Sequence, residues 1–244
     1  MLEICCESFE DAVHAYRGGA KRVELNSALH LGGLTPTAAC LDLVKAETDL
    51  KVICMVRPRG AGFCYTSMQI RQMFAVAEEL LEHGCDGLAF GFLTCEGKID
   101  EENTGRMTRL IHSYGKEAVY HRAFDCVKDP YLAAETLIGL GVDRILTSGL
   151  EEKAQDGIPV LKELVRRFQD RIEILAGSGV NASNVRHIME ETGVVQVHSS
   201  CRCWVKDPTT RGEKVSYGFG AEPNGEAYDG VKEEFVRMLV ELGI

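Results

Sequence analysis

Short apolar or β-branched runs alternate with amphipathic segments along the whole chain, and this alternation restricts its fold more than any other feature. Apolar runs of four to eight residues are typical of buried strands, and apolar residues three or four positions apart are typical of helices. Eight strands are predicted, at Leu2–Cys6, Arg22–Asn26, Lys51–Arg57, Gly87–Phe92, Glu117–Arg122, Arg144–Thr147, Ile172–Gly177 and Val194–His198. The clearest helices are predicted at Met68–Glu82, Lys153–Phe168, Ala182–Glu191 and Gly230–Leu242.

A glycine followed by a small residue recurs before every second predicted strand, at Gly19, Gly84, Gly141 and Gly193. Such glycines suit the left-handed position that ends a helix. Repeated strand-then-helix units favour a parallel sheet. The chain has 244 residues, close to the ~250 that are usual for a closed parallel barrel. An open doubly wound sheet is the alternative, but no glycine-rich dinucleotide fingerprint follows the first strand. We therefore predict one α/β domain over residues 1–244, a (β/α)8 TIM-like barrel with an extended loop after the last strand.

Charge and composition exclude several classes of partner. The 37 acidic and 27 basic residues give a net charge of -10, which disfavours binding to nucleic acid or to an anionic membrane surface. No apolar run approaches the roughly 18 residues of a membrane span, and the start of the chain lacks the basic region of a signal peptide. We therefore expect a cytoplasmic protein whose ten cysteines are reduced.

Residues 199–228 form the longest stretch without clear periodicity. A connection of this length usually has a function, so we expect it to cover the mouth of the barrel or to form an interface.

Polar side chains gather where the predicted strands end, which is the face where barrels of this type build their active sites. For any one of these residues, the alternative is a structural role, in which a hydrogen-bonded polar group only closes the end of the barrel. Because side chains alternate along a strand, the residues expected to point together are Glu3, Cys5 and Glu7; Glu24 and Asn26; Met55, Arg57 and Arg59; His121 and Asp125; and Gln196, His198 and Ser200. The sixth strand ends at the polar residues Thr147 and Ser148.

Two of these groups suggest catalysis on an anion. Arg57 and Arg59 could clamp a carboxylate or phosphate, although they could instead form ion pairs with Glu24 or Asp125. His121 and Glu24 could act as acid and base with Asp125 as the orienting group, whereas a histidine that only bonds a backbone carbonyl is the alternative.

The loops after the last two strands are a common phosphate-binding place in such barrels. Here they contain Gly177, Ser178, Gly179 and Ser199, whose backbone N–H groups could hold a phosphate. A glycine-rich turn that only redirects the chain is the other reading.

The cysteines suggest a soft metal ion. His198 is followed by Cys201 and Cys203, and thiolates with an imidazole suit Cu(I) or zinc. Cys5 and Cys6 point to opposite faces of a strand and cannot both bind one ion without distortion. Buried, unreactive thiols are the alternative.

Eight stretches together resemble the CutC family of copper-homeostasis proteins: Leu2-Glu-Ile-Cys-Cys-Glu-Ser, Arg22-Val-Glu-Leu, Gly32-Gly-Leu-Thr-Pro, Val56-Arg-Pro-Arg-Gly, Phe63-Cys-Tyr, His121-Arg-Ala-Phe-Asp, Leu146-Thr-Ser-Gly and Val197-His-Ser-Ser. The resemblance implies a TIM-like barrel, a cytosolic location and a homo-oligomer, often a dimer. It also implies copper handling through cysteines at the ends of the first two strands. Cys5 matches the first, and Asn26 stands where the family often has the second.

Two hypotheses about function follow. The first is cytosolic Cu(I) binding, with Cys5 as a ligand and help either from Cys6 or from the group of His198, Cys201 and Cys203. The second is an enzyme that acts on a small anionic, phosphorylated or sugar-like substrate at the barrel mouth. A third reading is a scaffold whose long loop after the last strand mediates assembly.

Overall fold

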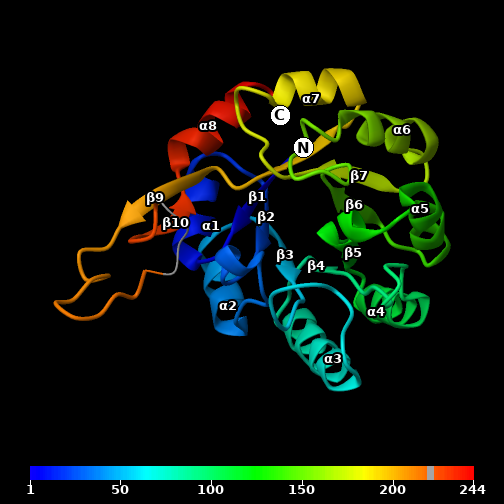
Figure 1. Ribbon diagram of the computed structural model, residues 1–244, viewed down its shortest axis with the longest axis horizontal. Helices are drawn as coiled ribbons and strands as arrows, with labels where there is room; N and C mark the ends of the chain where they lie inside the picture. Colours follow the sequence, from blue (N-terminus) through cyan, green and yellow to red (C-terminus); the bar gives the residue numbers. More distant parts are fainter. Residues whose placement is uncertain (219–222) are drawn as a thin grey trace.

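The computed structural model describes residues 1–218 and 223–244 and contains the predicted closed barrel (Figure 1). Each strand pairs in parallel with the next, and the last pairs with the first. The strands are β1 (Leu2–Cys6), β2 (Arg22–Leu25), β3 (Lys51–Met55), β4 (Gly87–Phe90), β5 (Glu117–Tyr120), β6 (Arg144–Thr147), β7 (Glu173–Ala176) and β8 (Gln196–Ser199). The predicted fold class is confirmed.

Helices surround the strands and cover their outer faces (Figure 1). They are α1 (Phe9–Arg17), α2 (Ala38–Glu47), α3 (Ser67–Glu82), α4 (Glu101–Ser113), α5 (Pro130–Gly139), α6 (Ile158–Phe168), α7 (Val185–Thr192) and α8 (Glu233–Glu241), with short 3-10 helices η1 (Leu29–Leu31) and η2 (Arg122–Cys126). The recurring glycines have the predicted left-handed backbone, with φ of 98° at Gly19, 82° at Gly84, 80° at Gly141 and 78° at Gly193. No helix within the described ranges combines the length and apolar character needed to cross a membrane.

Capping side chains explain several helix starts. Ser8 accepts a hydrogen bond from the backbone N–H of Asp11, and Thr66 forms a capping box with Gln69 at the start of α3. The helix predicted at Lys153–Phe168 begins only at Ile158, because the preceding residues form turns that end at Gly157. A helix initiated there accommodates the proline at its second position.

The segment after β8 is not a plain loop. Its ends pair as an antiparallel hairpin of β9 (Arg202–Lys206) and β10 (Ala227–Val231), and the predicted helix Gly230–Leu242 therefore shortens to α8. Figure 1 shows the hairpin projecting outward beside α1. Its base is held there because Asp11 Oδ1 accepts a 2.7 Å bond from the N–H of Val231. A role of this segment as an interface stays a prediction.

Near the starts of the strands, the inside of the barrel contains ion pairs, and we call this end the floor of the barrel. Arg22 Nε lies 2.7 Å from Glu3 Oε2, and Arg144 lies 2.9 Å from Glu117 and 2.8 Å from Glu173. Glu3, Arg22 and Arg144 are at most 4% exposed, so each charge needs its partners. Ile53, Met55, Ala89 and Val119 form a small apolar cluster of their own, separate from the large core that contains the helix-facing residues.

Candidate functional site

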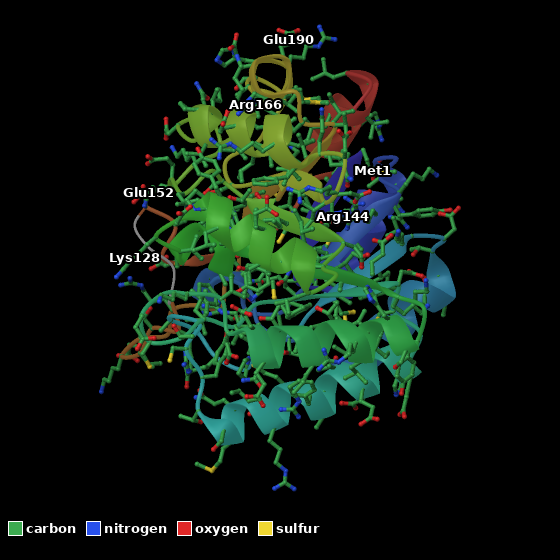
Figure 2. The ribbon with its side chains drawn as sticks, turned by 90° about the vertical axis from the view of Figure 1, so that its right-hand side faces the viewer. Met1, Lys128, Arg144, Glu152, Arg166 and Glu190 are labelled. Carbon is green, nitrogen blue, oxygen red and sulfur yellow. The ribbon has the colours of Figure 1, made fainter. Side chains whose placement is uncertain are left out.

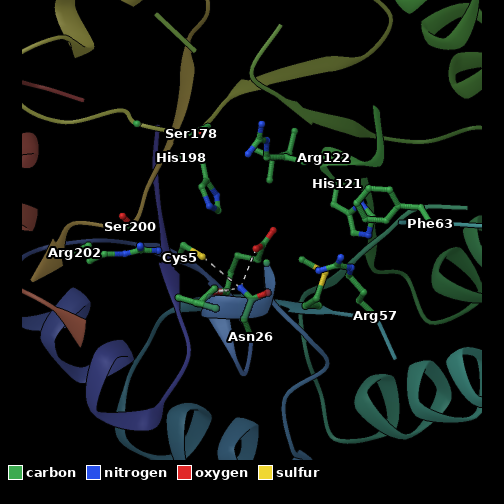
Figure 3. A pocket seen from close by; sticks show the side chains of 16 residues that line it. Cys5, Asn26, Arg57, Phe63, His121, Arg122, Ser178, His198, Ser200 and Arg202 are labelled. Carbon is green, nitrogen blue, oxygen red and sulfur yellow. Dashed lines mark hydrogen bonds between the residues drawn. The ribbon is translucent and has the colours of Figure 1, made fainter. Parts of the chain in front are cut away.

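A cavity of about 480 Å³ opens at the carboxyl ends of the strands. In Figure 2 this end lies to the left, where Lys128 and Glu152 come from the loops after β5 and β6, while Met1 and Arg144 at the strand starts lie further right. Figure 3 shows the side chains that line the cavity. Among the predicted residues, Cys5, Glu24, Asn26, Arg57, His121, Ser178, Gly179, His198 and Ser200 line it.

Three ligand-type side chains meet at one edge of this cavity. A sulfur of Cys5, a carboxylate oxygen of Glu24 and a ring nitrogen of His198 all lie within 4.8 Å of one another, and all three residues are buried. Strand register brings them together: Cys5 is the partner of Glu24 between β1 and β2, and Glu3 is the partner of His198 between β1 and β8. We call these three residues the Cys5–Glu24–His198 group.

Glu3 orients the imidazole of His198. Nδ1 of His198 lies 2.9 Å from Glu3 Oε1, so Nδ1–H donates to the carboxylate and Nε2 is the nitrogen left for the cavity. Burial opposes the charge on Glu3, but the bond from His198 and the positive charge of Arg22 outweigh it and lower the pKa of Glu3 to about 2. Burial likewise opposes a charge on His198, yet hydrogen bonds to Cys5 and Glu3 raise its pKa well above the usual value.

Asn26 bridges the other two members of the group. Its Nδ2 donates to Glu24 Oε1 at 2.9 Å and points at Cys5 Sγ at 3.5 Å, as the dashed lines in Figure 3 show. Burial raises the pKa of both Cys5 and Glu24. Within the described residues, Glu24 Oε2 and Asn26 Oδ1 are buried without a hydrogen-bond partner. Buried polar atoms without partners are uncommon, and here two of them lie close to the Cys5 thiol.

Arg57 donates hydrogen bonds to the backbone of the loops that follow β2 and β3. Its Nη1 donates to the carbonyls of Leu31 and Gly33 at 3.0 and 3.1 Å, and its Nη2 donates to Ala61. In the described part of the chain it makes no ion pair with Glu24 or Asp125, although its Cζ lies 5.0 Å from the ring centre of Phe63. Most of its donors are thus occupied by backbone, which leaves a weaker anion clamp than predicted.

His121 is held as a neutral donor. Its Nδ1 accepts a 3.0 Å bond from the N–H of Ala123, so the ring proton lies on Nε2, and this nitrogen has no partner among the described residues. Burial, together with the charge of Arg57, lowers the pKa of His121 to about 3. At neutral pH His121 therefore offers an N–H to a ligand in the cavity, which favours a donor role over the predicted acid–base role.

Two other predicted catalytic residues do not line the cavity. Arg59 donates to the carbonyls of Gly60, Gly62 and Cys64, all at 2.9 Å. Asp125 pairs with Arg122 at 2.7 Å and also accepts bonds from Thr147 and Ser148. Asp125 thus fixes the loop after β6 rather than orienting His121.

The predicted phosphate loop is only partly at the mouth. Ser178 and Gly179 line the cavity with φ of 80° and 71°, whereas a side chain at Gly177 would meet Leu146 at 2.6 Å. Ser199 donates to the carbonyl of Val180 at 2.6 Å and faces a neighbouring cavity of about 410 Å³. Gly179 lines both cavities, but Ser178 lines only the first and Ser199 only the second, so the predicted cradle is divided between them.

The predicted cluster of His198 with Cys201 and Cys203 does not form within the described ranges. The chain turns after β8, where Cys201 has φ of 42°, and its sulfur lies 3.7 Å from Ser199 Oγ. Burial raises the pKa of this thiol to about 11. Cys203 belongs to β9 of the hairpin. Glu24, predicted as a catalytic group, takes the place of these cysteines beside His198 and Cys5.

Several cavity residues had not been predicted as site residues, among them Phe63, Arg122 and Arg202. The Phe63 ring lies 5.0 Å from the ring of His121 and forms the wall opposite the Cys5–Glu24–His198 group (Figure 3). Phe63, Arg122 and Arg202 come from the segments that follow strands, where no periodic pattern indicates which side chain points inward.

The comparisons with known proteins agree with this architecture. Residues 1–203 match the model of the CutC family. The chain is 44% identical to the family protein CutC of Treponema denticola, over 90% of this chain and 89% of that one. It is 38% identical to the copper homeostasis protein cutC homolog of Homo sapiens, over 93% and 82% of the two chains.

A solved structure points to the same family. The crystal structure of CutC from Streptococcus agalactiae superposes with a TM-score of 0.77 at 33% identity, covering 82% of this chain and 98% of that one. The chain therefore belongs to the CutC family, in which curated relatives are named for copper homeostasis.

Proposed function

We propose that this protein takes part in copper homeostasis by binding one Cu(I) ion as cargo at the Cys5–Glu24–His198 group. The observation that carries the proposal is the convergence of a thiol, an imidazole and a carboxylate within 4.8 Å at the barrel mouth. The names of the curated relatives support copper as the ion.

The chemistry of the donors suits this ion in part. A thiolate from Cys5 and the Nε2 of His198 are soft and intermediate donors that Cu(I) accepts. The Glu24 carboxylate is a harder donor, which Cu(I) accepts less well. The Glu3–His198 bond keeps the imidazole in one orientation, which is how outer partners support metal-binding histidines in general.

Binding requires loss of protons from the site. Burial raises the pKa of Cys5, and the bonds to Cys5 and Glu3 raise that of His198, so the free site keeps protons on both donors. A bound Cu(I) replaces these protons, as metals do at other thiolate and imidazole sites. Cu(I) should therefore bind more tightly as pH rises.

An anaerobic titration of the reduced protein with Cu(I) against a competing chelator tests the proposal. The titration is best done in a Cys64→Ser/Cys95→Ser background, because these two exposed thiols could chelate the ion themselves. We expect one tightly bound ion per chain, and a loss of affinity of at least about tenfold in both Cys5→Ser and His198→Gln.

Cys201→Ser is the matched control, since Cys201 is also buried but lies outside the group. It should keep the affinity of the parent. Equal affinity in the parent, Cys5→Ser and His198→Gln would exclude this site.

A second candidate function rests on the size and polarity of the cavity. A volume of about 480 Å³ is far larger than one ion needs, and His121, whose Nε2–H has no partner among the described residues, lines the side of the cavity away from the Cys5–Glu24–His198 group. These features favour an enzyme that acts on a small anionic molecule bound beside His121 and Arg57.

Thermal-shift screening with small phosphorylated and carboxylated compounds tests this second function. A hit whose stabilisation disappears in His121→Phe but persists in Asp125→Asn would support it, because Asp125 does not line the cavity. Absence of any hit, with turnover absent for every compound, would exclude it.

A further inference from the structure

Two cysteines on neighbouring mouth loops lie against each other. Cys64 follows β3 and Cys95 follows β4, and both are exposed. Their Sγ atoms are 2.9 Å apart. A disulfide bond is roughly 2.05 Å long, so a small approach of the two sulfurs separates the thiols from a covalent link.

The loops are held in this arrangement by bonds of their own. The N–H of Leu93 donates to the carbonyl of Phe63 at 3.0 Å, which ties the residue before Cys64 to the loop that carries Cys95. On one side Arg59 Nη2 donates to the carbonyl of Cys64 at 2.9 Å. On the other, the N–H of Thr94 donates to the carbonyl of Lys98 at 2.8 Å and closes a turn around Cys95. These bonds hold together the two backbone segments that carry the sulfurs.

We infer that Cys64 and Cys95 form a reversible dithiol–disulfide site that exchanges with low-molecular-weight disulfides and locks the loops after β3 and β4 together. Exposure gives such a disulfide access to either sulfur, and the second sulfur is already in position to complete the exchange. The inference does not depend on copper binding, because neither cysteine belongs to the Cys5–Glu24–His198 group.

The exchange balances in two steps. The thiolate of one cysteine attacks a sulfur of the small disulfide, forms a mixed disulfide and releases one small thiolate. The thiolate of the other cysteine then attacks the protein sulfur, closes the Cys64–Cys95 bond and releases the second small thiolate. The two protons lost by the cysteines convert the released thiolates to thiols, so the protein pair is oxidised by two electrons and the small disulfide is reduced by two.

The link would act on the wall of the cavity. Phe63 precedes Cys64, its ring lies 5.0 Å from that of His121, and Arg57 stacks on it at 5.0 Å. A covalent bond one residue away removes the freedom of this wall to move outward. Oxidation is thus expected to narrow access to the mouth without touching the residues at its base.

The experiment uses the metal-free protein of 244 residues in buffers of reduced and oxidised glutathione at several ratios. Differential alkylation and mass spectrometry of peptides count the thiols that remain. We expect loss of two alkylatable thiols, one peptide pair that joins Cys64 to Cys95, and no retained glutathione. The pair should oxidise at a ratio of oxidised to reduced glutathione at least about tenfold lower than the ratio that modifies Cys126, because the second step is intramolecular.

Single variants separate this site from general thiol reactivity. Cys64→Ser and Cys95→Ser should each retain one glutathione on the remaining cysteine, since the resolving sulfur is gone. Cys126→Ser changes a third exposed cysteine and should form the Cys64–Cys95 link as the parent does. Independent glutathione adducts on Cys64 and Cys95 in the parent, at the ratio that modifies Cys126, would overturn the inference.

Discussion

Nδ1 of His198 and Oε1 of Glu3 lie 2.9 Å apart inside the barrel, and they join the mouth to the ionic floor. Glu3 also pairs with Arg22 at 2.7 Å, so the same carboxylate contacts both the mouth residue His198 and the floor residue Arg22. Its side chain is 1% exposed. Any change at Glu3 should therefore affect stability and the orientation of His198 together.

Glu3→Gln should lower the free energy of unfolding by about 3–5 kcal/mol, because it leaves the buried charge of Arg22 without its partner. Urea denaturation measures this change. Glu163→Gln is the matched control, since Glu163 pairs with Arg166 and Arg167 on the surface of α6, and it should change stability little. Equal effects of the two substitutions would show that the floor network does not stabilise the fold.

His121 should make the protein less stable in acid. Because the folded state holds the pKa of His121 at about 3, the ring stays neutral there, whereas the unfolded chain binds a proton below its usual pKa of 6.5. Stability contributed by neutral His121 is complete above about pH 6.5 and is lost as pH falls toward 3, at up to about 1.4 kcal/mol per pH unit.

Urea denaturation of the parent and of His121→Gln over this pH range tests that prediction. The difference in unfolding free energy between the two proteins should shrink as pH falls, since glutamine does not titrate. Parallel curves would mean that His121 titrates alike in the folded and unfolded states.

Asn26→Cys should increase Cu(I) affinity by at least about tenfold. The amide nitrogen of Asn26 lies 3.5 Å from Cys5 Sγ, so a thiol at this position would stand beside the first one, and two thiolates suit Cu(I) better than one. Competition with a chelator measures the change. Asn26→Ser, which removes the amide without adding sulfur, should not increase affinity; a similar gain in both variants would reject two-thiol binding as the reason.

Gly91→Ala should disturb His121 directly. A Cβ at Gly91 would lie 2.6 Å from Cε1 of His121 and 2.7 Å from Cβ of Ala123, and these buried neighbours have little room to move. We expect a loss of about 1–3 kcal/mol in unfolding free energy. Gly62→Ala, on a neighbouring mouth loop with nothing within 4 Å of its added Cβ, should be nearly neutral. Equal melting temperatures for the two variants would contradict this packing.

Much of the barrel could be predicted because its pattern is local. Buried strands such as Leu2–Cys6 are apolar and short, and the glycines that end helices α1 and α7 stand where a left-handed residue is needed. The two hairpin strands β9 and β10 could not be predicted in the same way. Most residues of β9 face solvent, whereas β10 mixes buried and partly exposed residues, and the two strands pair across about twenty intervening residues. No apolar run of the kind that marks a buried strand indicates them.

The sequence by itself determined which residues could perform chemistry at the mouth, because each strand end presents its polar side chains in a known alternation. Cys5, Glu24, His121 and His198 were found in this way. Only the tertiary structure decided their partners. Register placed Glu24 opposite Cys5, the turn after β8 carried Cys201 away from His198, and burial beside Arg57 left His121 neutral. These outcomes depend on distances and electrostatic environment between segments far apart in the chain, which no local pattern contains.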